Sequence, residues 1–599
     1  MNSPSLETKK YIFYSILYVA FFVLIARFFY LQIYRQAQYF QESEKNRIRQ
    51  VVLQPTRGLI YDRNGEVLVD NRPSYSVFAI PFEVRNADST LELAGNILDL
   101  ELSEMKKKIR TQRSGFFTPV KLKRQIGFDV LSKLEENRLD LPGIIYQTEP
   151  RRSYPSGVRA PHVFGYLGEV TQREIKQFEH LGYRLGDIVG KKGLEKVYDG
   201  QLQGLRGSRY IEVDALGREV RVLKDKPEIL PLPGKDLHLS MDRNLQEFLE
   251  TRMDTLRGGA VVADCRNGEI IALVSKPDYE PEIFTKPIPP DTWNELINDP
   301  HKPLYDRMVQ SLYPPGSTFK LVLAAAALEN NIISPSWISY CNGMLLFGRR
   351  TFDCWKKPGH GDVNLFEAIE QSCNVYFYKL GLKVGLENWS DFARKLRFGK
   401  KTGIDIINEN SGLVPDQQYL DNHYGKNKWS RGLLLNLAVG QGDLLVTPLQ
   451  IAAMSMIFAN RGMYYRFHLV RYIEDPIDHT RRWSMIDSVR VNGISQSTYD
   501  VIREGMYRVV NGAKGTARVC WFPDIRVAAK TGTAQNPHGE DHAWITGFAP
   551  YENPEIAFCV LVENGGSGGA VAGPIARGII QNYFDNKRKN LDKYTYDIR

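Results

Sequence analysis

The longest continuous apolar stretch of the sequence lies near its N-terminus. Residues Tyr11 to Tyr34 are almost wholly apolar, and about 20 helical residues suffice to cross the hydrocarbon core of a membrane. Lys9 and Lys10 precede this stretch, so the positive-inside rule predicts a cytoplasmic segment 1–10 and an extracytoplasmic remainder. A cleaved signal peptide is the alternative, but no small-residue cleavage site follows. We therefore expect a single-pass protein of the cytoplasmic (inner) membrane, with an uncleaved helix over residues 11–34 and a periplasmic or extracytoplasmic catalytic part.

Short alternations of apolar and polar residues follow this helix. They include Tyr75-Ser-Val-Phe-Ala-Ile80, and one polar helical stretch spans about Leu91 to Arg113. This mixture predicts an α+β domain over residues 41–230. Pro231-Leu-Pro-Gly234 then interrupts the pattern before a strand-like run, His238-Leu-Ser-Met241, and marks a domain boundary.

A second domain is predicted over residues 235–584. Strand-like runs occur near its beginning, at Gly259 to Asp264, and near its end, at Ile525 to Thr531 and Ile556 to Glu563. Helical periodicity lies between them, so we expect an α+β domain with a central antiparallel sheet, edge strands supplied late in the sequence, and a helical subdomain. Residues 585–599 are charged and are expected to form a frayed tail.

Composition restricts the class of protein only broadly. The chain has 599 residues, of which 43% are hydrophobic and 25% charged, with a formal net charge of +9. These values are typical of globular protein, and the length fits several domains. No dense Lys/Arg stripe interleaved with aromatic residues is present, so we expect no nucleic-acid partner. The excess of basic residues fits a surface that faces anionic lipid or wall polymer.

The strongest chemical motif is Tyr313-Pro-Pro-Gly-Ser-Thr-Phe-Lys320, which precedes a helical apolar run from Leu321 to Leu328. Ser317 and Lys320 are three residues apart, so a helix would place them on one face with the hydroxyl near its positive end. A serine hydroxyl is a weak nucleophile until a neighbouring base takes its proton, and a desolvated lysine can be that base. Taken alone, the spacing fits an ordinary helix N-cap equally well.

Two further motifs change this interpretation. Ser372-Cys-Asn374 follows a helix-like segment, Leu365 to Gln371, and Lys530-Thr-Gly-Thr533 follows the predicted strand Ile525 to Ala529. Each motif alone fits a helix cap or a strand end. The three together, in this order, resemble the motif set of penicillin-binding proteins and serine β-lactamases. The resemblance implies a serine transpeptidase/β-lactamase-like fold for the second domain.

The resemblance also implies catalytic roles. Ser317 would be the acylated nucleophile, and Lys320 would take its proton. Ser372 would relay a proton to the leaving amine, while Asn374 would hold the backbone of the donor peptide. Lys530 would supply positive charge to the substrate carboxylate or to the Ser372 hydroxyl.

Substrate binding is implied for the rest of the third motif. Thr531 and Thr533, on either side of Gly532, would hydrogen-bond the substrate carboxylate. The backbone N–H groups of Ser317 and Thr533 would form the oxyanion hole, in which one donor commonly contributes about 3 kcal/mol.

Resemblance to the class B penicillin-binding proteins covers nearly the whole chain. Their pedestal, or dimerisation-type domain, resembles the segments Arg57–Gly65, Arg152–Gly157, Pro161-His162, Gly193–Lys196 and Leu202–Gly207. Later transpeptidase motifs resemble Gly440–Gly442, Thr447–Gln450 and Trp544–Pro550. Turn chemistry alone also produces such Gly and Pro residues, but not in this number and order. No glycosyltransferase domain precedes the pedestal, so we do not expect the bifunctional class A layout.

The chain has six cysteines, and an extracytoplasmic location makes disulfides the first expectation. Cys265 and Cys559 lie in apolar strand-like runs, however, where buried free thiols are expected.

A metal site is predicted from the remaining pattern. Cys341, Cys354, His360 and Cys373 follow the spacing Cys-x12-Cys-x5-His-x12-Cys. Three thiolates and one imidazole form the closed tetrahedral set that structural zinc takes. A disulfide between two of the three cysteines is the alternative.

The segment Trp355 to Gly361 and the cysteine inside the second motif resemble elongation-type penicillin-binding protein 2, of which some members carry zinc here. Members often have an acidic ligand at the positions of Cys341 or Cys354, so Asp353 is a reserve candidate. Because Cys373 lies inside the second motif, such a zinc would brace the catalytic loop and perform no chemistry.

The resemblance therefore implies a peptidoglycan D,D-transpeptidase, a D-Ala-D-Ala carboxypeptidase-like acyltransferase that cross-links stem peptides during cell-wall elongation. It would act through an acyl ester on Ser317, where β-lactams would inhibit it covalently. Septal class B transpeptidase and a non-catalytic β-lactam-binding sensor or scaffold are the alternatives. A β-lactamase would need a base for the deacylating water, and we identify none. The resemblance to the elongation enzymes implies a SEDS-family (RodA-type) glycosyltransferase and a scaffold such as MreC as partners, besides stem peptides and the membrane.

Overall fold

The computed structural model describes residues 6–36, 48–84, 87–112, 118–177, 183, 185–213, 219–286, 288–426 and 428–597. The chain forms two compact units, which are considered separately. The first comprises residues 1–55, 73–149 and 205–232, and the second comprises residues 56–72, 150–204 and 233–599.

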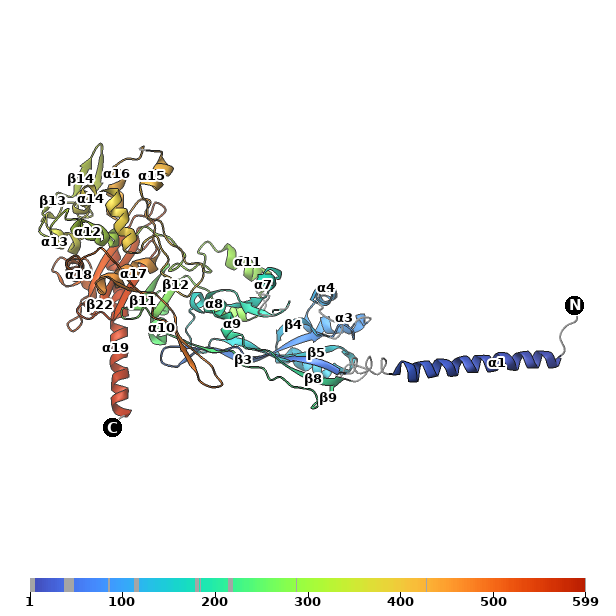
Figure 1. Cartoon of the computed structure of the whole chain (residues 1–599). Coiled ribbons are helices and arrows are strands. Elements are labelled where there is room, and N and C mark those ends of the chain that lie inside the picture. The colour runs from blue at the N-terminus through green and yellow to red at the C-terminus, as the bar shows by residue number, and fades with distance from the viewer. Residues whose placement is uncertain are drawn as a thin grey trace. The chain divides into compact units, whose positions relative to one another are not determined.

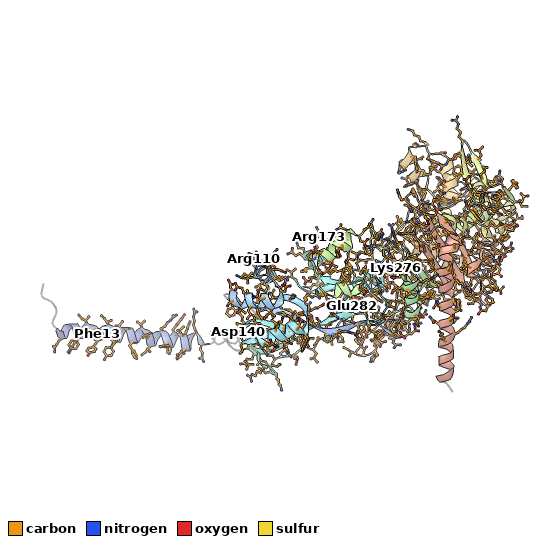
Figure 2. All side chains as sticks on the ribbon, turned by 180° about the vertical axis from the view of Figure 1, so that it is seen from behind. Phe13, Arg110, Asp140, Arg173, Lys276 and Glu282 are labelled. Atoms are coloured by element: carbon orange, nitrogen blue, oxygen red, sulfur yellow. The ribbon has the colours of Figure 1, made fainter. Side chains whose placement is uncertain are left out.

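The N-terminal apolar segment is helical. Helix α1 (Leu6–Phe29) continues as a π-helical turn, Tyr30–Tyr34. Among the described residues, Lys10–Tyr34 is the one stretch long and apolar enough to cross a membrane, judged by length and composition. Its large apolar side chains are exposed, and Phe13 projects freely from the helix (Figure 2). Such a surface is unfavourable in water and fits lipid or an apolar partner.

The core of the first unit lies between helices and three paired strands. Strand β3 (Val67–Ala79) contributes its later residues here, where it pairs with β4 (Val120–Ile126) and β5 (Ile144–Ser153). Helices α3 (Asp88–Leu98), α4 (Leu102–Gln112) and α5 (Phe128–Glu136) complete the core. A second sheet joins β1 (Ile48–Leu53), β8 (Gly207–Val213) and β9 (Glu219–Val222).

The expectation of a single helix from Leu91 to Arg113 is wrong. Two helices occupy this part of the sequence, because Asp99 takes a left-handed conformation with φ 53°. Its N–H bonds to the carbonyl of Gly95 and ends α3, as residues in this conformation commonly end helices.

The second unit is built on a five-stranded antiparallel sheet (Figure 1). The strand order is β12 (Ile270–Lys276), β11 (Gly258–Asp264), β23 (Ile556–Val562), β22 (His542–Ala549), β21 (Ala528–Ala534). Every residue of β11, β12 and β23 is buried, so both faces of the sheet are covered. The covering helices are α10 (Arg243–Arg252), α17 (Pro448–Ala459) and α19 (Gly573–Asp597).

Two sequence expectations about this sheet need correction. The late strands are not all edges, because β22 and β23 lie inside the sheet and only β21 forms an edge. The third motif was expected to follow a strand over Ile525 to Ala529, or to extend that strand no further than Thr531. Instead the motif lies inside β21, where Lys530 pairs with Thr546 of β22.

The C-terminal residues 585–599 were expected to form a frayed tail. Residues 585–597 are helical instead, because α19 continues to Asp597.

The helical subdomain lies between the early and late strands of the sequence. Its helices are α12 (Lys320–Glu329), α13 (Leu365–Glu370), α14 (Asn374–Lys395), α16 (Gly432–Ala438) and α18 (Gln496–Asn511). Helix α14 packs on α12 and α16, and α18 packs on α13 and β21. This packing brings the three sequence motifs together on the rim of the central sheet.

Another sheet of the second unit joins distant segments. Strand β10 (Asp236–Leu239) pairs in parallel with β2 (Ile60–Tyr61) and antiparallel with β18 (Val470–Glu474). Strand β19 (Arg481–Trp483) pairs with β18, and the first residues of β3 pair with β2. Residues 56–72 therefore lie within the second unit.

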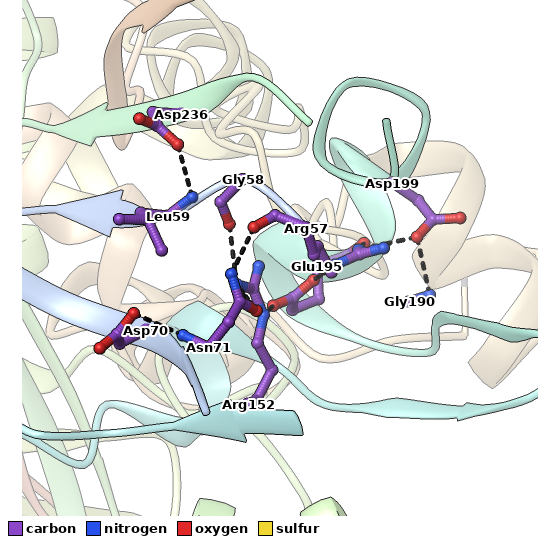
Figure 3. A network of polar contacts seen from close by, with 10 residues as sticks. All are labelled: Arg57, Gly58, Leu59, Asp70, Asn71, Arg152, Gly190, Glu195, Asp199 and Asp236. Carbon is purple, nitrogen blue, oxygen red and sulfur yellow. Dashed lines mark hydrogen bonds and ion pairs between the residues drawn. The ribbon is translucent and has the colours of Figure 1, made fainter. Parts of the chain in front are cut away.

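A buried ion network fixes this segment (Figure 3). Glu195 is 1% exposed and receives hydrogen bonds of 2.7 Å from the Nε atoms of both Arg57 and Arg152. Arg57 also pairs with Asp199 at 2.7 Å, and Arg152 donates to the carbonyl of Gly58. Burial raises the pKa of Glu195, but the two guanidinium groups outweigh it and hold the pKa below its ordinary value. The carboxylate is therefore charged and fully paired.

Candidate active site

The loop that carries Ser317 is pressed against strand β21. Ser317 lies on a short 3-10 turn, Gly316–Phe319, that leads directly into α12. Gly316 has φ +55°, and its N–H donates to the carbonyl of Gly440 at 2.8 Å. A Cβ at Gly316 would lie 2.8 Å from the carbonyl oxygen of Thr533. Only glycine allows both this conformation and this approach, so the nucleophile loop has one position beside the third motif.

Two buried lysines converge on the Ser372 hydroxyl. The Nζ atom of Lys320 donates to the carbonyl oxygen of Ser372 at 2.9 Å, to its Oγ at 3.2 Å and to Oδ1 of Asn374 at 2.7 Å. The Nζ atom of Lys530 donates to the same Oγ at 3.0 Å and to the carbonyl of Thr531 at 3.0 Å. Both lysines are 0% exposed. Residues more than 150 positions apart thus form one hydrogen-bonded group.

Burial makes both ammonium groups less stable than they are in water. It lowers the pKa of Lys320 to about 8, although the nearby thiols of Cys373 and Cys354 oppose this shift. Burial and the charge of Lys320 hold the pKa of Lys530 well below its ordinary value. At pH 7 roughly a tenth of Lys320 is therefore unprotonated and able to accept a proton, far more than an ordinary lysine would provide.

The second motif adopts a strained loop between two helices. Ser372 takes φ 54°, which is rare for a residue with a side chain. Cys373 is the N-cap of α14, and its N–H bonds to the carbonyl of Ala368. Asn374 begins α14 and donates from Nδ2 to the carbonyl of Asp353 at 3.2 Å. These contacts hold the Ser372 hydroxyl between the two lysines.

The third motif presents two hydroxyls from one face of β21. Thr531 and Thr533 alternate with Gly532 along the strand; Thr531 is buried and Thr533 exposed. A Cβ at Gly532 would lie 2.9 Å from that of Trp544 and 3.0 Å from the Thr318 methyl. Because Gly532 has no side chain, the loop that carries Ser317 can lie directly against β21.

The predicted catalytic residues Lys320, Ser372, Asn374 and Lys530 form one hydrogen-bonded group, and Ser317 lies on the turn that leads into the helix of Lys320. One contact differs from the sequence expectation. In the described part of the chain, the hydrogen bonds of the Lys320 amine go to Ser372 and Asn374, and none joins it to Ser317. Catalytic hydrogen bonds are often long before substrate binds, so this geometry is compatible with Lys320 as the base.

Two supporting residues outside the sequence motifs, Arg307 and Glu563, hold Tyr313 of the first motif in place. The Tyr313 hydroxyl donates to Oε1 of Glu563 at 2.6 Å, and Nε of Arg307 donates to the same oxygen at 3.0 Å. Burial and then the Glu563 carboxylate raise the pKa of Tyr313. Because Tyr313 begins the loop of Ser317, this network anchors the nucleophile loop to the end of β23. The partners are about 250 residues apart, so no local pattern could reveal them.

The predicted metal ligands also converge. Their ligand atoms all lie within 4.8 Å of one another: Cys341, Cys354, His360 and Cys373. Nδ1 of His360 lies 3.5 Å from one sulfur and 3.6 Å from another. All six cysteines of the chain are free and buried in the structure. The reserve candidate Asp353 points outward, with its side chain 59% exposed and paired with Lys357 at 2.9 Å.

Comparison with known proteins places this geometry in a family. Residues 258–581 match the model of the penicillin binding protein transpeptidase domain, and residues 52–239 match that of the penicillin-binding protein dimerisation domain. The chain is 32% identical to the peptidoglycan D,D-transpeptidase MrdA of Haemophilus influenzae, over 96% of this chain and 91% of that protein.

Solved structures of penicillin-binding proteins are similar to this chain over most of its length. In a complex of penicillin-binding protein 2 with MreC from Helicobacter pylori, the matching chain has a TM-score of 0.78 and 32% identity, covering 90% of this chain and 99% of that one. A peptidoglycan synthase complex that coordinates polymerization and crosslinking gives a TM-score of 0.70 at 28% identity, covering 96% and 97% of the two chains.

The chain therefore belongs to the class B penicillin-binding proteins, in which a dimerisation-type pedestal accompanies a transpeptidase domain. Within this class it is of the penicillin-binding protein 2 type, the peptidoglycan D,D-transpeptidases of cell-wall elongation. The resemblance found in the sequence motifs is thus confirmed, as is the two-domain α+β fold.

Proposed function

We propose that Ser317 is the nucleophile that this chain uses to cross-link stem peptides. Its Oγ attacks the carbonyl between the two terminal D-Ala residues of a donor stem and passes its proton to Lys320. The proposal is carried by one observation, the Ser372 hydroxyl held by two buried lysines beside the Ser317 loop. Backbone N–H groups of Ser317 and Thr533 stabilise the tetrahedral oxyanion.

The leaving amine then needs a proton. The Ser372 hydroxyl donates it and is reprotonated from Lys320, with which it shares a 3.2 Å hydrogen bond. Release of D-Ala leaves an ester on Ser317. The amine of an acceptor stem attacks this ester, a new amide forms, and Ser317 recovers its proton. Asn374 orients the donor backbone, and Lys530, Thr531 and Thr533 bind the terminal carboxylate.

The test is adduct formation with a fluorescent penicillin, which mimics the donor stem. Full-length wild-type protein in detergent should be labelled, Ser317→Ala should not, and Ser334→Ala should behave as wild type because that serine is exposed. Failure of wild type to form an adduct would refute the assignment. Loss of the label within seconds would indicate a hydrolase, because a transpeptidase retains the ester until an acceptor amine arrives.

We infer a cytoplasmic N-terminus and a periplasmic catalytic part. Support comes from the apolar helix Lys10–Tyr34 and from the location of peptidoglycan outside the membrane. In spheroplasts, added protease should digest the chain beyond residue 48 and leave a tag at the N-terminus intact. Protection of the catalytic part would refute this orientation.

We propose two protein partners, a SEDS-type glycosyltransferase and an MreC scaffold. The proposal is supported by the Helicobacter pylori complex with MreC and by the peptidoglycan synthase complex, both of which contain a chain similar over most of its length. Affinity capture of the tagged chain from detergent-solubilised membranes of its own host should recover both proteins. Recovery of the tagged chain without either would contradict the proposal.

We propose a structural zinc ion held by Cys341, Cys354, His360 and Cys373. Buried thiols around an imidazole nitrogen match the donors that zinc takes in closed structural sites. Bound zinc would supply only rigidity, because all four positions of a tetrahedral ion would be filled. These four residues tie β13 (Ser339–Cys341), the loop after β15 (Arg350–Asp353) and the start of α14 together.

Elemental analysis checks the zinc proposal. Wild type and Cys265→Ala should each hold about one zinc per chain, while Cys354→Ser should hold far less. Because Cys265 is a buried thiol outside the cluster, it is the matched control. A wild-type content well below one, or a disulfide among the cluster cysteines, would reject the site.

A further inference from the structure

A threonine outside the three motifs contacts the proposed carboxylate-binding face. Thr516 lies in the loop between α18 and a 3-10 turn, Arg518–Cys520. Its hydroxyl oxygen is 2.7 Å from that of Thr531, close enough for a good hydrogen bond. No sequence motif includes Thr516, and the two residues meet because α18 packs against β21.

The hydrogen-bond inventory restricts how this pair works. A threonine hydroxyl has one proton and can donate one hydrogen bond, but it can accept others. If Thr531 donated to Thr516, its proton would no longer be available to a substrate carboxylate, which only accepts. If Thr516 donates instead, the proton of Thr531 remains free for the carboxylate, and a hydroxyl that accepts a hydrogen bond becomes a better donor.

We propose that Thr516 is a positioning residue that donates to Thr531 and thereby directs the Thr531 hydroxyl proton toward the carboxylate of the substrate. This inference rests on the proposed function, in which Thr531 binds that carboxylate.

A purely structural role for the Thr516 hydroxyl has less support. Backbone hydrogen bonds already hold the loop, from the N–H of Ala517 to Val509 at 2.9 Å and from that of Gly515 to Gly512 at 3.2 Å. The side chain of Asn511 adds a bond of 2.9 Å to the carbonyl of Val527. The backbone of Thr516 also lies close to Gly569, where a Cβ would come within 2.5 Å of its carbonyl oxygen. The loop is thus fixed without the hydroxyl.

The experiment compares two acylating agents on the same full-length protein. One is benzylpenicillin, which carries the carboxylate, and the other is its methyl ester, which does not. The measured quantity is the ratio of their second-order acylation rate constants. This ratio is independent of the folded fraction, because both agents report on the same active molecules.

Thr516→Val keeps the shape and removes the donor. We expect the ratio to fall roughly tenfold, as weakening a hydrogen bond to a charged group implies, with the rate for the ester little changed. Thr516→Ser keeps the hydroxyl and should retain the wild-type ratio, and Thr516→Ala should repeat the effect of Val. In a Thr531→Val background, Thr516→Val should cause no further change, since its partner is absent.

The outcomes separate the two proposals. If wild type is acylated by neither agent, the proposed function fails. If wild type is acylated but Thr516→Val and Thr516→Ala leave the ratio unchanged, or slow both agents equally, the positioning role is wrong. A full effect of Thr516→Val in the Thr531→Val background would also overturn it, because Thr516 would then act by another route.

Discussion

Neutralising Glu195 should destabilise the second unit far more than neutralising a partly exposed carboxylate of the same unit. Glu195 lies between Arg57 and Arg152 and is 1% exposed (Figure 3). Glu195→Gln keeps the size of the side chain but leaves two buried guanidinium groups without their shared anion. Breaking a buried charge pair in this way commonly costs about 3–5 kcal/mol. Glu174→Gln is the matched control, because Glu174 pairs with Lys191 at 2.6 Å with both side chains 18% exposed, and partly solvated pairs contribute about 1 kcal/mol or less.

Hydrogen exchange measured by mass spectrometry can locate this loss. Peptides covering residues 56–72 contain Arg57 and depend on the network for their position. A loss of about 3 kcal/mol in local opening free energy corresponds to roughly a hundredfold faster exchange. We expect this acceleration in Glu195→Gln, and a change of less than about tenfold near the substitution in Glu174→Gln. Equal exchange of residues 56–72 in both variants would refute the argument that the buried network holds this segment.

The stability that the charge of Glu195 contributes should depend on pH. The pKa of Glu195 is held below its ordinary value of 4.5, so its charged form stabilises the folded state above that value. This stabilisation is lost as the pH falls through the lower, folded-state pKa. The difference between wild type and Glu195→Gln should therefore be constant near pH 7 and shrink below about pH 4.5. A difference that grows on acidification would contradict the assigned charge.

Further predictions concern the site. Acylation of Ser317 by a penicillin should accelerate roughly tenfold per pH unit between pH 6 and 7 and level off above about pH 8, because Lys320 loses its proton with a pKa of about 8. A flat rate profile from pH 6 to 9 would exclude Lys320 as the base. Gly440→Ala should slow acylation by at least about tenfold, because its Cβ would lie 2.1 Å from the Gly316 carbonyl oxygen and displace the nucleophile loop. Gly348→Ala, at a turn with no atom within 4 Å of the new Cβ, is the control, and equal rates for the two variants would contradict the steric argument.

Sequence patterns predicted the elements whose signals are local. The apolar run of α1, the buried strands β11 and β23 and the helix after Lys320 follow directly from residue periodicity. The extent of β21 did not, because the strand-like run was expected from Ile525 to Thr531 while the pairing with β22 extends from Ala528 to Ala534. Strand pairing with a distant partner, and not local composition, decides where such a strand ends.

Residue types at the site were predicted better than their contacts. The four side chains of the proposed metal site were selected from their chemistry, their spacing and the family resemblance, and the structure brings them together. The side-chain direction of Asp353 was open, because it depends on how β15 meets the next loop. Thr516 was not predicted at all, since nothing in its own segment indicates that it contacts Thr531.

The left-handed conformation of Ser372 has a consequence for the evolution of this enzyme. A side chain at φ 54° commonly costs about 1 kcal/mol or more relative to glycine, and burying the hydroxyl between two lysines adds desolvation. Selection for stability alone would favour glycine at this position, which would also remove the proposed proton relay. The folded state therefore gives up part of its stability where activity requires it. Stabilising substitutions found by a screen for heat resistance should therefore lie elsewhere in the chain. A stabilising substitution at Ser372 would indicate that the screen no longer required cross-linking activity.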